Sequence, residues 1–176
     1  MDYRFLGRTG IRVSNLCFGT MSFGGDADAD TSGALYAACR DAGINFFDCA
    51  NIYNGGQAEE ILGGLIGSER DDLVITSKCY FPTGTDVNAR GASRRHIPLA
   101  VEDSLRRLGT DRLDVLFVHH WDDFTPLEET LGALDYIVRS GRALYAGISS
   151  YNAEHTRQAV AILNDLGTPC LIHQPS

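Results

Sequence analysis

Four residues of the 176-residue chain, Asp48, Tyr53, Lys78 and His119, have side-chain types that could together reduce a carbonyl group. The reaction needs a hydride on carbon and a proton for the developing alkoxide. A tyrosine is a poor acid near neutral pH, because its reference pKa is about 10. A nearby lysine ammonium would stabilise tyrosinate, and an aspartate would hold that lysine charged. A histidine could then donate a hydrogen bond to the carbonyl oxygen.

The adjacent histidines His119 and His120 raise a second possibility, a metal-dependent hydrolase, since Asp122 and Asp123 follow closely. Adjacent residues of a strand point to opposite faces, so both rings cannot readily bind one ion. No third His or Cys stands at ligand spacing. We therefore predict that the site holds no metal and that His120 serves in packing or in support of the site.

Short apolar, β-branched runs alternate with longer segments of helical spacing along the whole chain. After an N-terminal hairpin (3–6 and 11–13), the predicted strands are 16–20, 45–49, 73–78, 113–119, 143–149 and 170–174. The predicted helices are 30–42, 58–66, 93–108, 127–140 and 153–166. Serial strand–helix pairs indicate a parallel sheet, because parallel strands need crossover connections.

Two α/β architectures fit this order, an open doubly wound sheet and a TIM-type (β/α)₈ barrel. The glycines at 63, 64 and 67 lie in a predicted helix and have the wrong spacing for the dinucleotide-binding fingerprint of the first. A whole barrel takes about 250 residues. We therefore predict one domain over residues 1–176, a barrel truncated after about six strands and incomplete at its C-terminus. An inactive truncated fragment is one alternative for its function.

Polar residues end five consecutive predicted strands, where barrel enzymes place their chemistry. These residues are Asp48, Lys78, His119, Ser149 and Gln174, and Tyr53 follows the first of them. One polar strand end has a simple explanation, because strands emerge into solvent. An Asp, a Lys and a His on three neighbouring strands favour a shared site instead.

Composition narrows the class of partner. The net charge of −8 has no basic stretch, which argues against nucleic acid or an anionic membrane as a partner. Five widely spaced cysteines without a C-x-x-C pair favour a reducing compartment. The sequence shows neither a signal peptide nor an apolar run of about 20 residues, so we predict a cytoplasmic protein. It does not define an oligomeric state.

Several segments resemble the aldo-keto reductase superfamily. Residues 43–53 are similar to its G-x-x-x-x-D-T-A-x-x-Y signature, with Cys49 in place of Thr. Residues 73–78 are similar to its lysine strand and residues 113–119 to its histidine strand. Segments 5–10, 18–21, 147–150 and 173–176 extend the resemblance over nearly the whole chain. Segments 128–130, 144–151 and 171–176 resemble the branch of bacterial glyceraldehyde-3-phosphate-type reductases and potassium-channel β subunits.

The resemblance implies a reductase that passes hydride from NADPH to a small aldehyde or ketone. Tyr53 would be the general acid, with Lys78 and Asp48 tuning its acidity and His119 orienting the carbonyl. In the family, the last two strands of the barrel hold the adenosine 2′-phosphate of NADP, and they are not among the six strands predicted here. The preference for NADP over NAD is therefore implied by the resemblance alone. The branch allows a second reading, a cofactor-sensing regulatory subunit of the channel-β type.

The same resemblance implies residues that bind cofactor and substrate. Ser149 and Gln174 would bind the nicotinamide carboxamide, and Asp48 would lie near the nicotinamide ribose. Ser150, at a position where many relatives have Asn, is a further candidate cofactor residue. Met21 would contact both cofactor and substrate, and Trp121 would flank the substrate.

Overall fold

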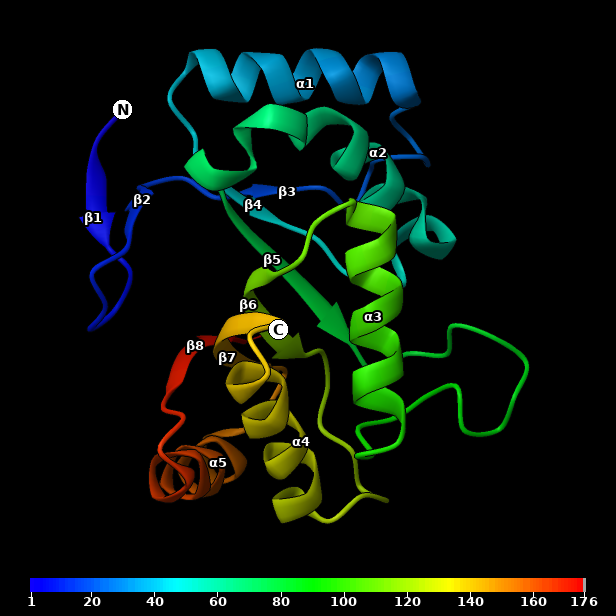
Figure 1. The fold of residues 1–176 in the computed structure, drawn as a ribbon, viewed down its shortest axis with the longest axis vertical. Helices are drawn as coiled ribbons and strands as arrows, with labels where there is room; N and C mark the ends of the chain where they lie inside the picture. The colour runs from blue at the N-terminus through cyan, green and yellow to red at the C-terminus, as the bar shows by residue number, and fades with distance from the viewer. Residues whose placement is uncertain (176) are drawn as a thin grey trace.

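The computed structural model describes residues 1–175, which form two separate sheets and five α-helices (Figure 1). The smaller sheet is an N-terminal antiparallel hairpin, as predicted. Its strands are β1 (Tyr3–Phe5) and β2 (Arg12–Ser14). The hairpin lies beside the larger sheet rather than within it.

The larger sheet has six parallel strands, hydrogen-bonded in the order in which they occur along the chain. They are β3 (Phe18–Gly19), β4 (Phe46–Asp48), β5 (Val74–Cys79), β6 (Leu113–Val118), β7 (Ala143–Ser149) and β8 (Cys170–Gln174). A doubly wound sheet would reverse its strand order at a switch point. The continuous order confirms the predicted barrel architecture, here a half-barrel of six strands.

Helices join successive strands and pack around the sheet (Figure 1). They are α1 (Ala29–Asp41), α2 (Gln57–Ile66), α3 (His96–Leu108), α4 (Leu127–Arg139) and α5 (Ala153–Leu166), with two 3₁₀ segments, η1 (Tyr53–Gly56) and η2 (Gly67–Asp72). Within residues 1–175, no helix has the length and apolar character to cross a bilayer.

Local chemistry accounts for several helix ends. The Asp28 carboxylate accepts the Thr31 N–H at the start of α1, and the Asn152 side chain accepts the His155 N–H at the start of α5. Gly167 ends α5 with a φ of 79°, a left-handed conformation that glycine adopts without steric cost.

Strand alternation divides the main sheet into two chemically different faces. Phe47, Ile75 and Leu116 are buried toward the helix layer, where Phe47 packs on Tyr36 of α1 with ring centroids 5.2 Å apart. The opposite face lines the barrel interior and carries Thr76 on β5. The apolar face stabilises the fold, and the polar ends of the interior face are free for chemistry.

The structure adjusts a few predicted boundaries. Strand β3 is shorter than the predicted 16–20, because only Phe18 and Gly19 pair with β4. Helix α3 begins at His96 rather than near residue 93, and the Ser93 hydroxyl accepts the His96 N–H at 3.1 Å. Strands β7 and β8 and helix α5 have the predicted bounds.

Candidate active site

Parallel pairing brings the carboxyl ends of β4, β5 and β6 to one edge of the sheet. Asp48 is in register with Thr76, and Lys78 is in register with Phe117. His119 directly follows β6, and its N–H donates to the Cys79 carbonyl at 3.1 Å. Three strand ends that are far apart in the sequence therefore meet at one place.

Lys78 is the centre of the hydrogen-bonded group. Its ammonium nitrogen lies 2.5 Å from Asp48 Oδ2, 2.8 Å from the Cys49 carbonyl and 3.2 Å from the Tyr53 hydroxyl. The three protons of the ammonium thus have three partners. The Lys78 side chain is only 1% exposed, so its charge and that of Asp48 interact with little solvent screening.

His119 completes the set of four predicted residues. Its ring meets the Tyr53 ring edge-on, with centroids 5.9 Å apart. Burial, followed by the nearby Lys78 charge, lowers the pKa of His119 from 6.5 to about 4. The imidazole is therefore neutral near pH 7 and can donate a hydrogen bond from one nitrogen. Its buried Nδ1 has no hydrogen-bond partner among residues 1–175.

Two further residues beside the site were not predicted. The Thr76 hydroxyl donates to Asp48 Oδ1 at 2.6 Å, opposite the oxygen that Lys78 binds. Thr76 lies two residues before Lys78 and therefore on the same face of the strand, and this alternation was the available signal. Phe81 lies edge-on to His119, with centroids 5.0 Å apart. It belongs to the irregular segment after β5, where periodicity gives no information.

The barrel interior contains a cavity of about 290 Å³ next to this group. Its lining residues are Leu6, Cys17, Phe46, Asp48, Thr76, Phe117, Ile172, His173, Gln174 and Pro175. Asp48 and Gln174, two of the predicted cofactor residues, therefore face the same space. The cavity joins the carboxylate of the site to an amide side chain at the end of β8.

Ser149 and Ser150 lie at the end of β7, close to β8. Their hydroxyl oxygens are 3.5 Å apart, and the Ser150 N–H donates to the Gln174 carbonyl at 3.0 Å. Ser150 has a φ of 57°, a left-handed conformation that Asn adopts more readily than most residues. The structure thus brings the predicted carboxamide-binding residues together.

Met21 and Trp121 lie outside the cavity lining. The Met21 side chain is 68% exposed, and its carbonyl accepts a hydrogen bond from the Asn54 side chain at 2.8 Å, next to Tyr53 in the sequence. The Trp121 indole stacks on His155 with centroids 3.5 Å apart. The structure therefore places Met21 beside the tyrosine segment and Trp121 against the start of α5.

The two cysteines beside the site are buried thiols. Burial, followed by the charge of Glu59, raises the pKa of both Cys49 and Cys79 to about 12. Neither is a thiolate at neutral pH, which makes both poor nucleophiles. Within residues 1–175, no three His, Cys, Asp or Glu side chains are grouped so as to hold a metal ion.

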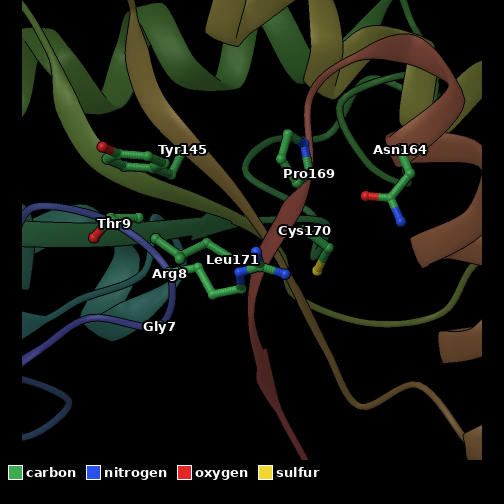
Figure 2. Close-up of a pocket in the computed structure, with 8 residues that line it drawn as sticks. All are labelled: Gly7, Arg8, Thr9, Tyr145, Asn164, Pro169, Cys170 and Leu171. Carbon is green, nitrogen blue, oxygen red and sulfur yellow. The ribbon is translucent and has the colours of Figure 1, made fainter.

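A larger cavity, of about 680 Å³, lies at the other end of the sheet (Figure 2). It is bounded by the hairpin turn at residues 7–9, by Tyr145 and by the start of β8, and none of the predicted site residues lines it. The candidate chemistry is thus confined to the carboxyl ends of the strands, as the barrel architecture leads us to expect.

The chain belongs to the aldo/keto reductase family, whose sequence profile matches residues 15–176. Its six parallel strands correspond to part of the barrel of that family.

Two named relatives represent different roles. A probable voltage-gated potassium channel subunit beta from Oryza sativa subsp. japonica is 41% identical over 181 residues, covering 99% of this chain and 55% of the relative. An L-glyceraldehyde 3-phosphate reductase from Escherichia coli (strain K12) is 38% identical over 183 residues, covering 100% of this chain and 53% of the relative. The chain spans about half the length of these relatives.

A solved structure shows the same architecture. It is a crystal structure of a thermostable aldo-keto reductase, Tm1743, in complex with the inhibitor epalrestat. The TM-score is 0.86 at 31% sequence identity, with the whole of this chain matched to 62% of the other. The half-barrel is therefore similar to the corresponding part of a known aldo-keto reductase barrel.

Proposed function

We propose that the protein is an NADP-dependent reductase of small aldehydes or ketones, with Tyr53 as the general acid. The observation that carries the proposal is the position of Lys78, whose ammonium contacts both the Asp48 carboxylate and the Tyr53 hydroxyl. Such a chain of contacts lets a phenol release a proton, because the adjacent positive charge stabilises the phenolate that remains.

Each of the four residues has a role that follows from its surroundings. Thr76 holds the Asp48 carboxylate, which in turn holds the Lys78 ammonium in place. Lys78 stabilises the Tyr53 oxygen as its proton moves to the substrate oxygen. His119, which is neutral near pH 7, donates a hydrogen bond to that same oxygen and orients the carbonyl. Phe81 packs edge-on against His119 and limits its movement.

NAD(P)H is the typical cofactor of this family, and the cavity residues fit its nicotinamide end. Gln174, which lines the cavity, has both a donor and an acceptor for a carboxamide, and Ser149 of β7 is in register with it on the neighbouring strand. Asp48 lines the same cavity and could accept from a ribose hydroxyl. When bound, the reduced nicotinamide would supply the hydride.

The test is Tyr53→Phe in the intact protein, because this change removes the hydroxyl and keeps the ring. We expect NADPH-dependent turnover of a small aldehyde to fall about 1000-fold, the scale of general acid catalysis. We expect NADPH affinity, measured by fluorescence titration, to stay within about twofold. Tyr136→Phe, on the exposed side of α4, is the matched control and should behave as wild type. Undiminished turnover in Tyr53→Phe would refute the assigned acid.

A cofactor-sensing regulatory subunit is a second candidate, which the 41% identity to a probable potassium channel subunit beta favours. Such a protein would keep the four site residues, turn over slowly and bind a channel protein. Single-turnover oxidation of bound NADPH, combined with a pull-down on membranes from the source organism, separates the two functions. Fast turnover without a channel partner supports the reductase, whereas slow turnover with a captured channel supports the regulatory subunit.

A further inference from the structure

A buried ion pair lies on the helix side of β5, directly behind the site, and consists of Glu59 of α2 and Arg107 of α3. We propose that this pair is a positioning device, which fixes the distance between the Tyr53 hydroxyl and the Lys78 ammonium. The proposal rests on the proposed function, since it assigns the pair a role in the same proton transfer. Neither residue touches the site itself.

Glu59 links the segment that carries Tyr53 to the strand that carries Lys78. Its side chain is fully buried, and Oε1 accepts from the Ser77 hydroxyl at 2.5 Å. Ser77 immediately precedes Lys78 on β5 and points to the opposite face of the strand. Glu59 lies in the first turn of α2, which continues directly from η1, and η1 begins at Tyr53. One carboxylate therefore ties both elements together.

Arg107 binds the other carboxylate oxygen of Glu59 and also packs against η1, the segment that begins at Tyr53. Its Nε and Nη2 lie 2.8 Å and 2.7 Å from Glu59 Oε2. Its side chain also passes against Gly56, where an added Cβ would lie 2.9 Å from Arg107 Cδ. Gly56 is the last residue of η1 and has a φ of 97°, which favours glycine, and a side chain there would displace Arg107.

The segment held in this way is a left-handed turn that directly follows Tyr53. Asn54, Gly55 and Gly56 have φ values of 50°, 68° and 97°, a run of left-handed residues that Asn and Gly adopt more readily than other residues. On the opposite side, the Asn54 amide donates to the carbonyls of Met21 and Phe23 at 2.8 Å and 2.7 Å. Contacts of both Arg107 and Asn54 therefore hold the left-handed turn right after Tyr53.

A charged pair suits positioning better than an apolar pair would. Burying a carboxylate and a guanidinium is costly, and apolar side chains of similar volume often stabilise a fold as well or better. Hydrogen bonds are directional, however, and those of Glu59 hold α2 and β5 in one relative position. Its charge also contributes to the raised pKa of Cys49 and Cys79, the chain neighbours of Asp48 and Lys78.

The experiment compares Glu59→Gln, Arg107→Met and the double variant in the intact protein. Single-turnover oxidation of NADPH by a saturating small aldehyde should slow about 10- to 100-fold in all three, because a displacement near 1 Å costs on the order of 100-fold. NADPH affinity should stay within about twofold. The single changes should lower the melting temperature, and the double variant should recover part of it, because no buried charge is left unpaired.

The decisive comparison is between rate and stability. A rate that stays low in the double variant while its melting temperature recovers supports positioning. A rate that recovers together with the melting temperature, or that never falls, overturns the proposal. Arg70→Met is the control, since Arg70 forms a comparably buried ion pair with Asp114 at the opposite end of β5. It should lower the melting temperature and leave the rate per folded molecule unchanged.

A spectroscopic readout separates this proposal from the proposed function. In protein labelled with ¹³Cζ-tyrosine, the Tyr53 resonance is identified by its loss in Tyr53→Phe. We expect it to shift in Glu59→Gln and to remain in place in Arg70→Met. If wild type does not turn over with NADPH, the reductase assignment fails and the resonance still decides the positioning role. A Tyr53 resonance that does not move in Glu59→Gln contradicts it.

Discussion

Two ion pairs of neighbouring elements contact β5, one near each end of the strand, and they serve different purposes. Near the start of the strand, Asp114 accepts from the Ile75 N–H and from Arg70 at 2.8 Å and 2.9 Å. Near its end, beside Lys78, the Ser77 hydroxyl donates to Glu59, which Arg107 also binds. One ion pair therefore contacts β5 near each of its two ends.

The two ends differ in how completely their polar groups are satisfied. Arg70 also donates to the Leu73 and Arg112 carbonyls and to the Thr110 hydroxyl, so its guanidinium joins several segments of main chain. At the other end, a left-handed turn follows Tyr53, and the buried His119 Nδ1 has no partner among residues 1–175. The guanidinium of Arg70 is thus held by several acceptors, whereas the site keeps a buried ring nitrogen without a partner among the described residues.

Lys78→Met should have the largest effect on turnover, and it tests the end of β5 that carries the candidate site. The change leaves the Asp48 carboxylate without its cation and removes the charge next to the Tyr53 hydroxyl. We expect steady-state turnover of the intact protein to fall more than about 1000-fold, which is about 4 kcal/mol of barrier. Turnover within threefold of wild type would show that the ammonium has no part in the proton transfer.

Arg70→Met should have the next largest effect, on stability alone. It leaves the Asp114 carboxylate buried and unpaired, and the free energy of unfolding should fall by about 3 kcal/mol in urea titrations. Because Arg70 lies near the start of β5, away from the candidate site, the rate per folded molecule should not change. A large loss of rate without a loss of stability would erase the distinction between the two ends.

Gly63→Ala should have a smaller effect, through helix packing. An added Cβ at this position would lie 2.6 Å from the Arg107 carbonyl oxygen and 2.8 Å from two Leu108 backbone atoms. Helices α2 and α3 must then separate, at a cost of about 2 kcal/mol. Thermal unfolding measures this cost, and Gly64→Ala is the control because nothing lies within 4 Å of its added Cβ. Equal stability of the two variants would contradict the close packing.

The last prediction concerns the pH dependence of stability. The folded-state pKa of His119 is lowered from 6.5 to about 4, so the unfolded chain takes up this proton first as the pH falls. The native state should therefore lose stability between about pH 6.5 and 4. His119→Gln removes this contribution while His96, whose pKa is also lowered by burial, is retained. Identical pH profiles for the two proteins would contradict a buried neutral His119.

Much of the architecture and the four-residue group followed from the sequence. Boundary residues help to define two of the correctly predicted elements, because Gly141 precedes β7 and Asn152 and Gly167 cap α5. Residues at the ends of parallel strands share an edge of the sheet, so Asp48, Lys78 and His119 could be grouped without coordinates. Tyr53 was assigned with the help of the family signature, since a residue in a turn has no strand end to place it.

The supporting contacts could not be predicted in the same way. Glu59 and Arg107 are 48 residues apart on different helices, and each alone is typical of a solvent-exposed helix position. Their pairing depends on the packing of α2 on α3, which Gly63 allows. Phe81 lies in an irregular segment without hydrophobic periodicity. The turn after Tyr53 has φ values set by tertiary contacts, which a sequence pattern of Asn and Gly only permits.

The central claim is that the Tyr53 hydroxyl, 3.2 Å from the Lys78 ammonium, gives its proton to the carbonyl oxygen. The most direct test is the solvent deuterium isotope effect on single-turnover NADPH oxidation in wild type and Tyr53→Phe. We predict that the rate is about twofold slower in D₂O for wild type and that the residual rate of the variant shows no such effect. An equal isotope effect in both proteins would show that the proton comes from another group.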